Sequence, residues 1–272
     1  QGSLFDSFAQ PATEAIVTGT GVGAKQIFRV NLSTGATSQI SDGSIFPNIH
    51  ASMALLDQDT ALLTTNQPGG DLYKLNLNTN TVQLLTSGYL PGIIFSGGIA
   101  LENRNSLLIG SSDGALRRMN LNTLTVTQTQ TIDSDLRGIA LESKSFALVL
   151  DQNNSIYRVN LTDLSFSSLG PVTGGQGRHI ALDTTRDIAL IGQSGASQIE
   201  RFDLSTNTTL TSIGSLTGGA GRGIALENSS SVLVGDNSGG LYRVNLDTGA
   251  TSRVDDGTLS SITPRAIAVR FQ

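Results

Sequence analysis

Ile156-Tyr-Arg-Val-Asn-Leu161 is the clearest copy of a hexapeptide that occurs six times and decides the fold. It is rich in β-forming residues, and apolar and polar side chains alternate along part of it, which predicts a strand. Neighbouring copies begin 40 to 45 residues apart. The copies begin at Ile27, Leu72, Leu116, Ile156, Ile199 and Leu241.

Three further strands accompany each hexapeptide. A turn such as Asp247-Thr-Gly249 and a Thr/Ser/Val-rich segment follow it, which is typical of a hairpin. Two apolar segments precede it, as in Gly138-Ile-Ala-Leu-Glu142 and Ala147-Leu-Val-Leu150. Four short antiparallel strands in ~43 residues predict one blade of a β-propeller.

The two ends of the chain complete each other. The first unit begins at Ala15-Ile-Val17 without an opening strand, and the missing motif stands at Arg265-Ala-Ile-Ala-Val269. We therefore predict an all-β, six-bladed propeller, closed by a C-terminal strand at 265–270 that completes the first blade. Residues 1–272 would form one domain with an N-terminal extension at 1–13. A β-solenoid is the alternative, but it gives no reason for the displaced strand.

Composition excludes several classes of function. The chain of 272 residues has a net charge of −5, which argues against a nucleic-acid partner. It has no Cys, so disulfides, thiol nucleophiles and Cys-ligated metals are excluded. No apolar run approaches the ~20 residues of a transmembrane helix.

The motif Pro264-Arg-Ala-Ile-Ala-Val269, with its relatives at 137–141 and 222–226, resembles the opening strand of NHL-type and YWTD-type propeller repeats. The whole unit is similar to YVTN repeats of surface proteins. The Asp that closes the second strand in the YWTD type occurs at Asp151 and Asp236, and the aromatic part of that motif is missing. The resemblance implies a closed propeller that serves as a binding platform, although some related six-bladed propellers are metal-dependent lactonases.

An anion site is predicted at the mouth of the central channel, where the opening strands begin. Matching Gly-rich loops at 173–178 and 217–222 contain Gly175 and Gly219, which permit close approach of a ligand to the backbone. Alternatively, the loops make only tight turns and the arginines pair with Asp151 and Asp236. An arginine precedes four of the opening strands, and its guanidinium group can donate two parallel hydrogen bonds to a carboxylate or phosphate. These arginines are Arg137, Arg178, Arg222 and Arg265.

Four other residues interrupt the repeat. His179 replaces a motif glycine and would add a donor to the anion, and His50 precedes the second unit. Metal binding, base catalysis and plain hydrogen bonding all stay open for both. Tyr89 and Phe95 lie in an irregular apolar segment at 88–96, which would form a lip for a ligand or simply pack on its neighbour. We expect no cofactor, with Ca²⁺ left open for the turns at 111–114 and 236–239.

A cation recurs in the third strand of every unit, which favours a structural role over a ligand site. We expect these cations to pair with carboxylates such as Glu102, Glu142, Asp183 and Glu227. They are Arg29, Lys74, Arg118, Arg158, Arg201 and Arg243.

The sequence thus predicts a non-enzymatic propeller of a bacterial surface or periplasmic protein that binds an anionic small molecule, a glycan or a protein. Short blades leave little chain for catalytic loops, and few Lys with many Ser, Thr and Asn favour a location outside the cytoplasm. Two alternatives remain. One is an enzyme at the channel mouth, namely a metal-dependent lactonase, another hydrolase or a polysaccharide lyase. The other is a purely structural module of a larger protein.

Overall fold

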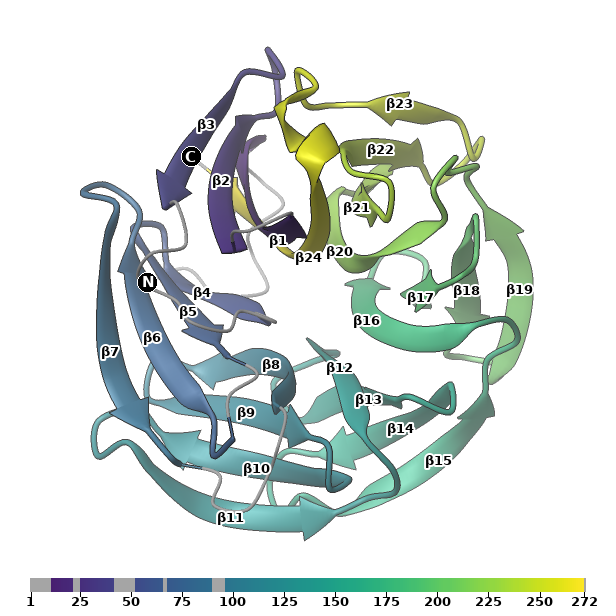
Figure 1. The fold of residues 1–272 in the computed structure, drawn as a ribbon. Helices are drawn as coiled ribbons and strands as arrows, with labels where there is room; N and C mark the ends of the chain where they lie inside the picture. Colours follow the sequence, from purple (N-terminus) through teal and green to yellow (C-terminus); the bar gives the residue numbers. More distant parts are fainter. Residues whose placement is uncertain (1–10, 22–24, 42–51, 66–67, 90–95, 272) are drawn as a thin grey trace.

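The protein is a six-bladed β-propeller (Figure 1). The computed structural model describes residues 11–21, 25–41, 52–65, 68–89 and 96–271. Six antiparallel sheets of four strands stand around a central axis, and in each sheet the strands run in chain order from the axis outward, apart from the first blade. The predicted fold is therefore confirmed, and the solenoid alternative is wrong.

The first blade contains β24 (Ile262–Phe271), β1 (Ala12–Gly21), β2 (Lys25–Asn31) and β3 (Thr37–Ser41). The second contains β4 (Met53–Asp57), β5 (Thr60–Thr64), β6 (Asp71–Asn76) and β7 (Thr81–Ser87). The third contains β8 (Ser96–Asn103), β9 (Ser106–Ser111), β10 (Ala115–Asn120) and β11 (Thr125–Thr131). The fourth blade contains β12 (Leu136–Leu141), β13 (Phe146–Asp151), β14 (Ser155–Asn160) and β15 (Phe166–Pro171). The fifth contains β16 (Gln176–Asp183), β17 (Ile188–Ser194), β18 (Ile199–Asp203) and β19 (Thr208–Ile213). The sixth contains β20 (Ala220–Asn228), β21 (Ser231–Asp236), β22 (Leu241–Asn245) and β23 (Thr251–Arg253).

The C-terminal strand closes the ring by pairing with the N-terminal one. β24 is the innermost strand of the first blade and runs antiparallel to β1, with Thr18 opposite Ala266. The Ala266 N–H donates to Thr18 Oγ1 at 3.2 Å. β1 begins at Ala12, three residues before the predicted start, and β24 extends beyond the predicted 265–270 at both ends.

The core consists of apolar layers between neighbouring blades. In β13, Ala147 and Val149 pack toward the third blade, whereas Leu148 and Leu150 pack toward the fifth. All four side chains are fully buried. A strand with both faces buried reads as a continuous apolar run, which is why the second strand of each unit shows no alternation.

The asparagine of the hexapeptide shapes the hairpin that follows it. The Asn76 side-chain oxygen accepts the N–H groups of Asn78 and Thr79, each at 2.9 Å. This Asx turn satisfies backbone donors that the sheet leaves unpaired. Four residues after each such Asn or Asp, the backbone enters the left-handed region, at Gly35, Asn80, Leu124, Leu164, Asn207 and Gly249.

Third-strand arginines connect strands and neighbouring blades. Arg118 forms two hydrogen bonds to Glu102 of the same blade, at 2.6 and 2.8 Å, and also donates to the Leu161 carbonyl of the next blade. Arg243 likewise pairs with Glu227 and donates to the Leu32 carbonyl at 3.2 Å.

The predicted carboxylate pairing is thus confirmed for Glu102 and Glu227, and Arg158 pairs with Glu142 in the same way. Asp183 behaves differently, because it binds Arg186 at 2.8 Å. The equivalent cation of that blade, Arg201, instead donates to the Thr211 carbonyl.

Deleting residues 265–272 should severely destabilise the protein or make it insoluble. The deletion removes most of β24, exposes an edge of β1 and opens the apolar layers on both sides. Thermal unfolding of the truncated chain measures the effect. An unchanged unfolding temperature would contradict ring closure by this strand.

Arg118→Ala should lower the free energy of unfolding by about 1–3 kcal/mol, because Glu102 loses its ion pair and the Leu161 carbonyl loses a donor. The matched control is Arg201→Ala, since Arg201 has no ion pair in the described part of the chain and bonds only within its own hairpin. Urea unfolding of both variants measures the difference. Equal losses would show that neither the ion pair with Glu102 nor the contact with the next blade adds to stability.

Candidate functional site

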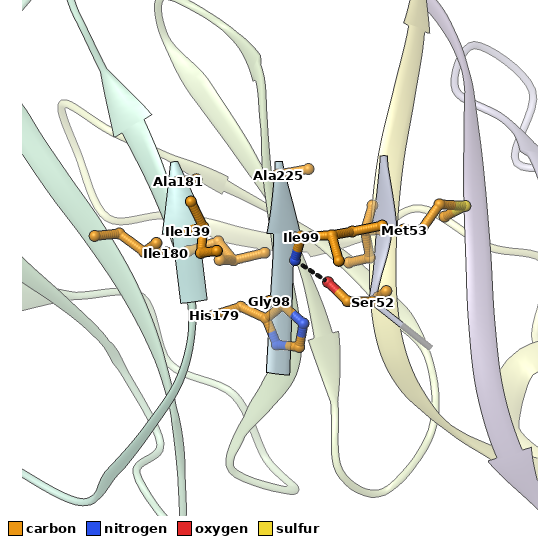
Figure 2. Close-up of a pocket in the computed structure, with 12 residues that line it drawn as sticks. Ser52, Met53, Gly98, Ile99, Ile139, His179, Ile180, Ala181 and Ala225 are labelled. Carbon is orange, nitrogen blue, oxygen red and sulfur yellow. Dashed lines mark hydrogen bonds between the residues drawn. The ribbon is translucent and has the colours of Figure 1, made fainter. Parts of the chain in front are cut away.

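The inner strands of all six blades line one cavity on the axis, of about 200 Å³ (Figure 2). Each blade contributes one large apolar side chain to its wall, and these side chains are between 5% and 8% exposed. The wall is therefore an apolar ring made of Met53, Ile99, Ile139, Ile180, Ile224 and Ile267.

Two polar side chains line the same cavity. The Ser52 hydroxyl accepts the Ile99 N–H at 3.0 Å, a bond dashed in Figure 2, and the second polar side chain is the imidazole of His179. His179 occupies a position that is glycine in three other blades, at Gly98, Gly138 and Gly223. A Cβ at Gly138, for example, would lie 2.9 Å from the Ile180 nitrogen. In the fifth blade, the histidine side chain is partly buried and faces the cavity instead.

Three of the predicted arginines occupy β-bulges at the start of inner strands. The ladder skips Arg137 in β12, Arg178 in β16 and Arg265 in β24. A bulge takes its residue out of the normal alternation and turns the side chain in a new direction. Arg178 and Arg265 directly precede residues that line the cavity, and Arg137 stands two residues before Ile139, so all three stand at the same end of the channel.

β20 is irregular in the same place, between Ala220 and Ile224. The side chain of Arg222 lies outside the described residues, so its part in the site stays a prediction. The same holds for His50 and Phe95, which also lie outside them.

The described arginines differ in their contacts. Arg137 forms an ion pair with Asp135, and its guanidinium also donates to the Gln152 side chain at 3.1 Å. Arg178 donates to Gln176 at 2.7 Å. Arg265 donates through Nε to Thr20 Oγ1 at 3.2 Å, whereas its buried Nη1 has no acceptor among the described residues.

Asp135 is the acidic residue that sequence reasoning missed. Its burial raises the pKa of the carboxyl group, while the positive charges of Arg137 and Arg178 act in the opposite direction. Its position two residues before Arg137 was the available signal.

The carboxylates expected as arginine partners instead bind backbone N–H groups, Asp151 in its own turn and Asp236 in the second Gly-rich loop. Asp151 accepts the Ser155 N–H at 2.8 Å, and Asp236 accepts the Gly218 N–H at 3.0 Å.

The first Gly-rich loop is held from inside the molecule. The Gly175 N–H donates to the Gln193 side-chain oxygen at 2.8 Å, and the Gln193 amide donates to the Thr173 carbonyl at 2.9 Å. Gln193 is fully buried. Gly219 of the second loop has a φ of 90°, which suits glycine. Both glycines thus shape turns, and a ligand role for either stays a prediction.

Tyr89 packs with the apolar layer between the second and third blades, close to Gly70. It does not line the cavity. Among the described residues, no three His, Asp or Glu side chains are grouped as metal ligands.

Gln193→Leu should destabilise the protein by about 1–3 kcal/mol, because the Gly175 N–H and the Thr173 carbonyl both lose the side chain that holds them. Gln130→Leu is the matched control, since Gln130 is less buried than Gln193 and, among the described residues, its side chain bonds only to the adjacent Thr131 carbonyl. Urea unfolding compares the two. A loss no greater than that of the control would show that Gln193 does not hold the loop.

No protein-family model matches the sequence, and no curated protein matches it. Many solved structures share its fold. A chain in the crystal structure of a nidogen/laminin complex superposes with a TM-score of 0.77 at 11% identity, over 95% of this chain and 98% of that one. TolB from Acinetobacter baumannii superposes with a TM-score of 0.69 at 16% identity, over 97% of this chain and 67% of its own. These comparisons place the chain among six-bladed propellers.

Proposed function

We propose that this protein is a non-enzymatic binding propeller whose channel mouth receives an acidic group of a protein partner. One observation carries the proposal: three inner strands each place an arginine on a bulge at the same end of the axial cavity. The structural arginine Arg118, by contrast, is paired with Leu108 in its ladder and lies beside Glu102. The mouth arginines break the ladder instead.

Charge at the mouth favours an acidic ligand. Asp135 balances part of the positive charge of Arg137 and Arg178. Arg265 has no ion pair with any described residue, and one of its buried nitrogens lacks an acceptor. Leaving a buried donor unsatisfied costs about 1–3 kcal/mol, so an arriving carboxylate gains by accepting from it. The guanidinium fork suits this geometry.

Two further observations support a binding role. The described side chains lining the cavity include a single imidazole and a single hydroxyl, with no carboxylate beside them. General acid–base hydrolysis at this place would need another titratable group. The likeness to a chain of a nidogen/laminin complex favours a protein as the partner over a small molecule or a glycan.

We also propose that the protein acts outside the cytoplasm, at the bacterial surface or in the periplasm. The scarcity of Lys and the similarity to YVTN surface repeats support this location. No helix in the described parts of the chain has the length and apolar character to span a membrane.

Binding of hexaglutamate, capped at both ends, tests the acidic partner. At low ionic strength, where charges act over longer distances, isothermal titration should detect binding to the wild type. Arg178→Gln/Arg265→Gln should weaken it by about tenfold or more. The matched control is Arg104→Gln/Lys144→Gln, which removes two exposed charges from turns at the opposite end of the inner strands.

Absence of wild-type binding at millimolar hexaglutamate would overturn the proposal, and so would an equal loss in the control. Hydrolysis of lactones that depends on an added divalent cation would favour the enzyme alternative instead.

A further inference from the structure

The axial cavity is mostly apolar, whereas the mouth arginines next to it are charged. Arg265 precedes Ala266 and Ile267, which line the cavity, and Arg178 precedes His179 and Ile180, which do the same. One residue of a strand advances the chain by ~3.3 Å. A ligand that uses both parts must therefore carry a charge and an apolar group only a few ångströms apart.

The size of the cavity limits the apolar group. Its volume of about 200 Å³ far exceeds what one water needs, yet lies below the ~300 Å³ of the smallest usual ligand pockets. The lining residues occupy three successive positions of the inner strands, which gives a depth of roughly 7 Å. A branched aliphatic side chain fits these dimensions.

The wall offers such a group an apolar surface on every side. Each blade contributes one Ile or Met, and small residues widen the space, including Ala181 and Ala225. The Ser52 hydroxyl already accepts a backbone N–H.

We infer that the site binds the C-terminal residue of a partner polypeptide, with its α-carboxylate on Arg265 and its aliphatic side chain in the axial cavity. This inference rests on the proposed function and names the acidic group. An Asp or Glu side chain supplies a carboxylate but nothing to fill an apolar cavity. A C-terminal Leu, Ile or Val supplies both groups from one residue.

The guanidinium of Arg265 is suited to this role. Its Nε is fixed by Thr20, which orients the plane of the group, and its Nη1 is the buried donor that lacks an acceptor among the described residues. A carboxylate at this place accepts the hydrogen bond that Nη1 cannot make within the described residues.

A short peptide series tests the inference without altering the protein. Isothermal titration compares acetyl-Gly-Gly-Leu with a free carboxylate, the same peptide as an amide, and acetyl-Gly-Gly-Gly with a free carboxylate. The first should bind the wild-type chain, and each of the other two should bind about tenfold more weakly or worse, because each lacks one of the two groups.

Two variants separate the two parts of the site. Arg265→Gln should remove the preference for the free carboxylate over the amide, while Arg104→Gln leaves it unchanged. Ala225→Leu should fill the cavity and remove the preference for Leu over Gly, without weakening the binding of capped hexaglutamate. Thermal unfolding verifies that each variant is folded, and the peptide series alone decides if one is not.

The inference is overturned if acetyl-Gly-Gly-Leu binds no better than acetyl-Gly-Gly-Gly or than its amide. If capped hexaglutamate still binds through the mouth arginines, the proposed function survives and only the C-terminal residue is wrong. If 4-methylpentanoate binds more tightly than the peptide, the ligand is a free aliphatic acid and the polypeptide assignment is wrong.

Discussion

Burial of the middle strands on both faces is the constraint on which the rest of this structure depends. A sheet such as β12–β15 cannot cover its own apolar side chains, because Ala147 and Leu148 point to opposite sides and each side needs a neighbouring blade. Every blade therefore buries the apolar faces of its two neighbours, and they bury its own. Burial is complete only when the last layer meets the first, so the ring has to close.

The hydrogen bonds between blades add to this apolar packing, and they are not what makes the ring close. Arg118 and Arg243 place a guanidinium where one blade meets the carbonyl of the next, which satisfies a backbone acceptor at the boundary. The Asx turns instead satisfy backbone donors inside each hairpin. Six similar layers then bring the inner strands close together around the axis. Glycines such as Gly138 permit the approach, and the residues in their place elsewhere, His179 and Ser52, give the cavity its polar side.

The sequence predicts the repeated features of the fold well, because repetition averages out local ambiguity. Six copies of one hexapeptide establish the number of blades, and the displaced motif at 265–269 locates the closing strand. The pairing of Arg118 with Glu102 could also be predicted, since both positions recur.

The candidate site is less accessible to such reasoning. A β-bulge changes the register by one residue and leaves no mark in the apolar pattern, so the direction of Arg265 could not be read from it. The acidic partners of the mouth arginines were expected at motif positions, Asp151 and Asp236, yet Arg137 pairs with the nearer Asp135. The motif isoleucines were recognised as strand residues, but their convergence on one cavity depends on ring closure.

Ring closure also bears on how the chain folds as the ribosome makes it. The hydrogen bond between Thr18 and Ala266 joins residues 248 positions apart, so β1 leaves the ribosome long before its inner partner exists. Each later blade can dock on its predecessor as soon as it is complete, whereas β1 must wait with one edge unpaired. Contacts between such distant residues slow folding, and an open edge invites pairing with other chains. The nascent propeller is therefore most exposed to aggregation just before its final strand emerges.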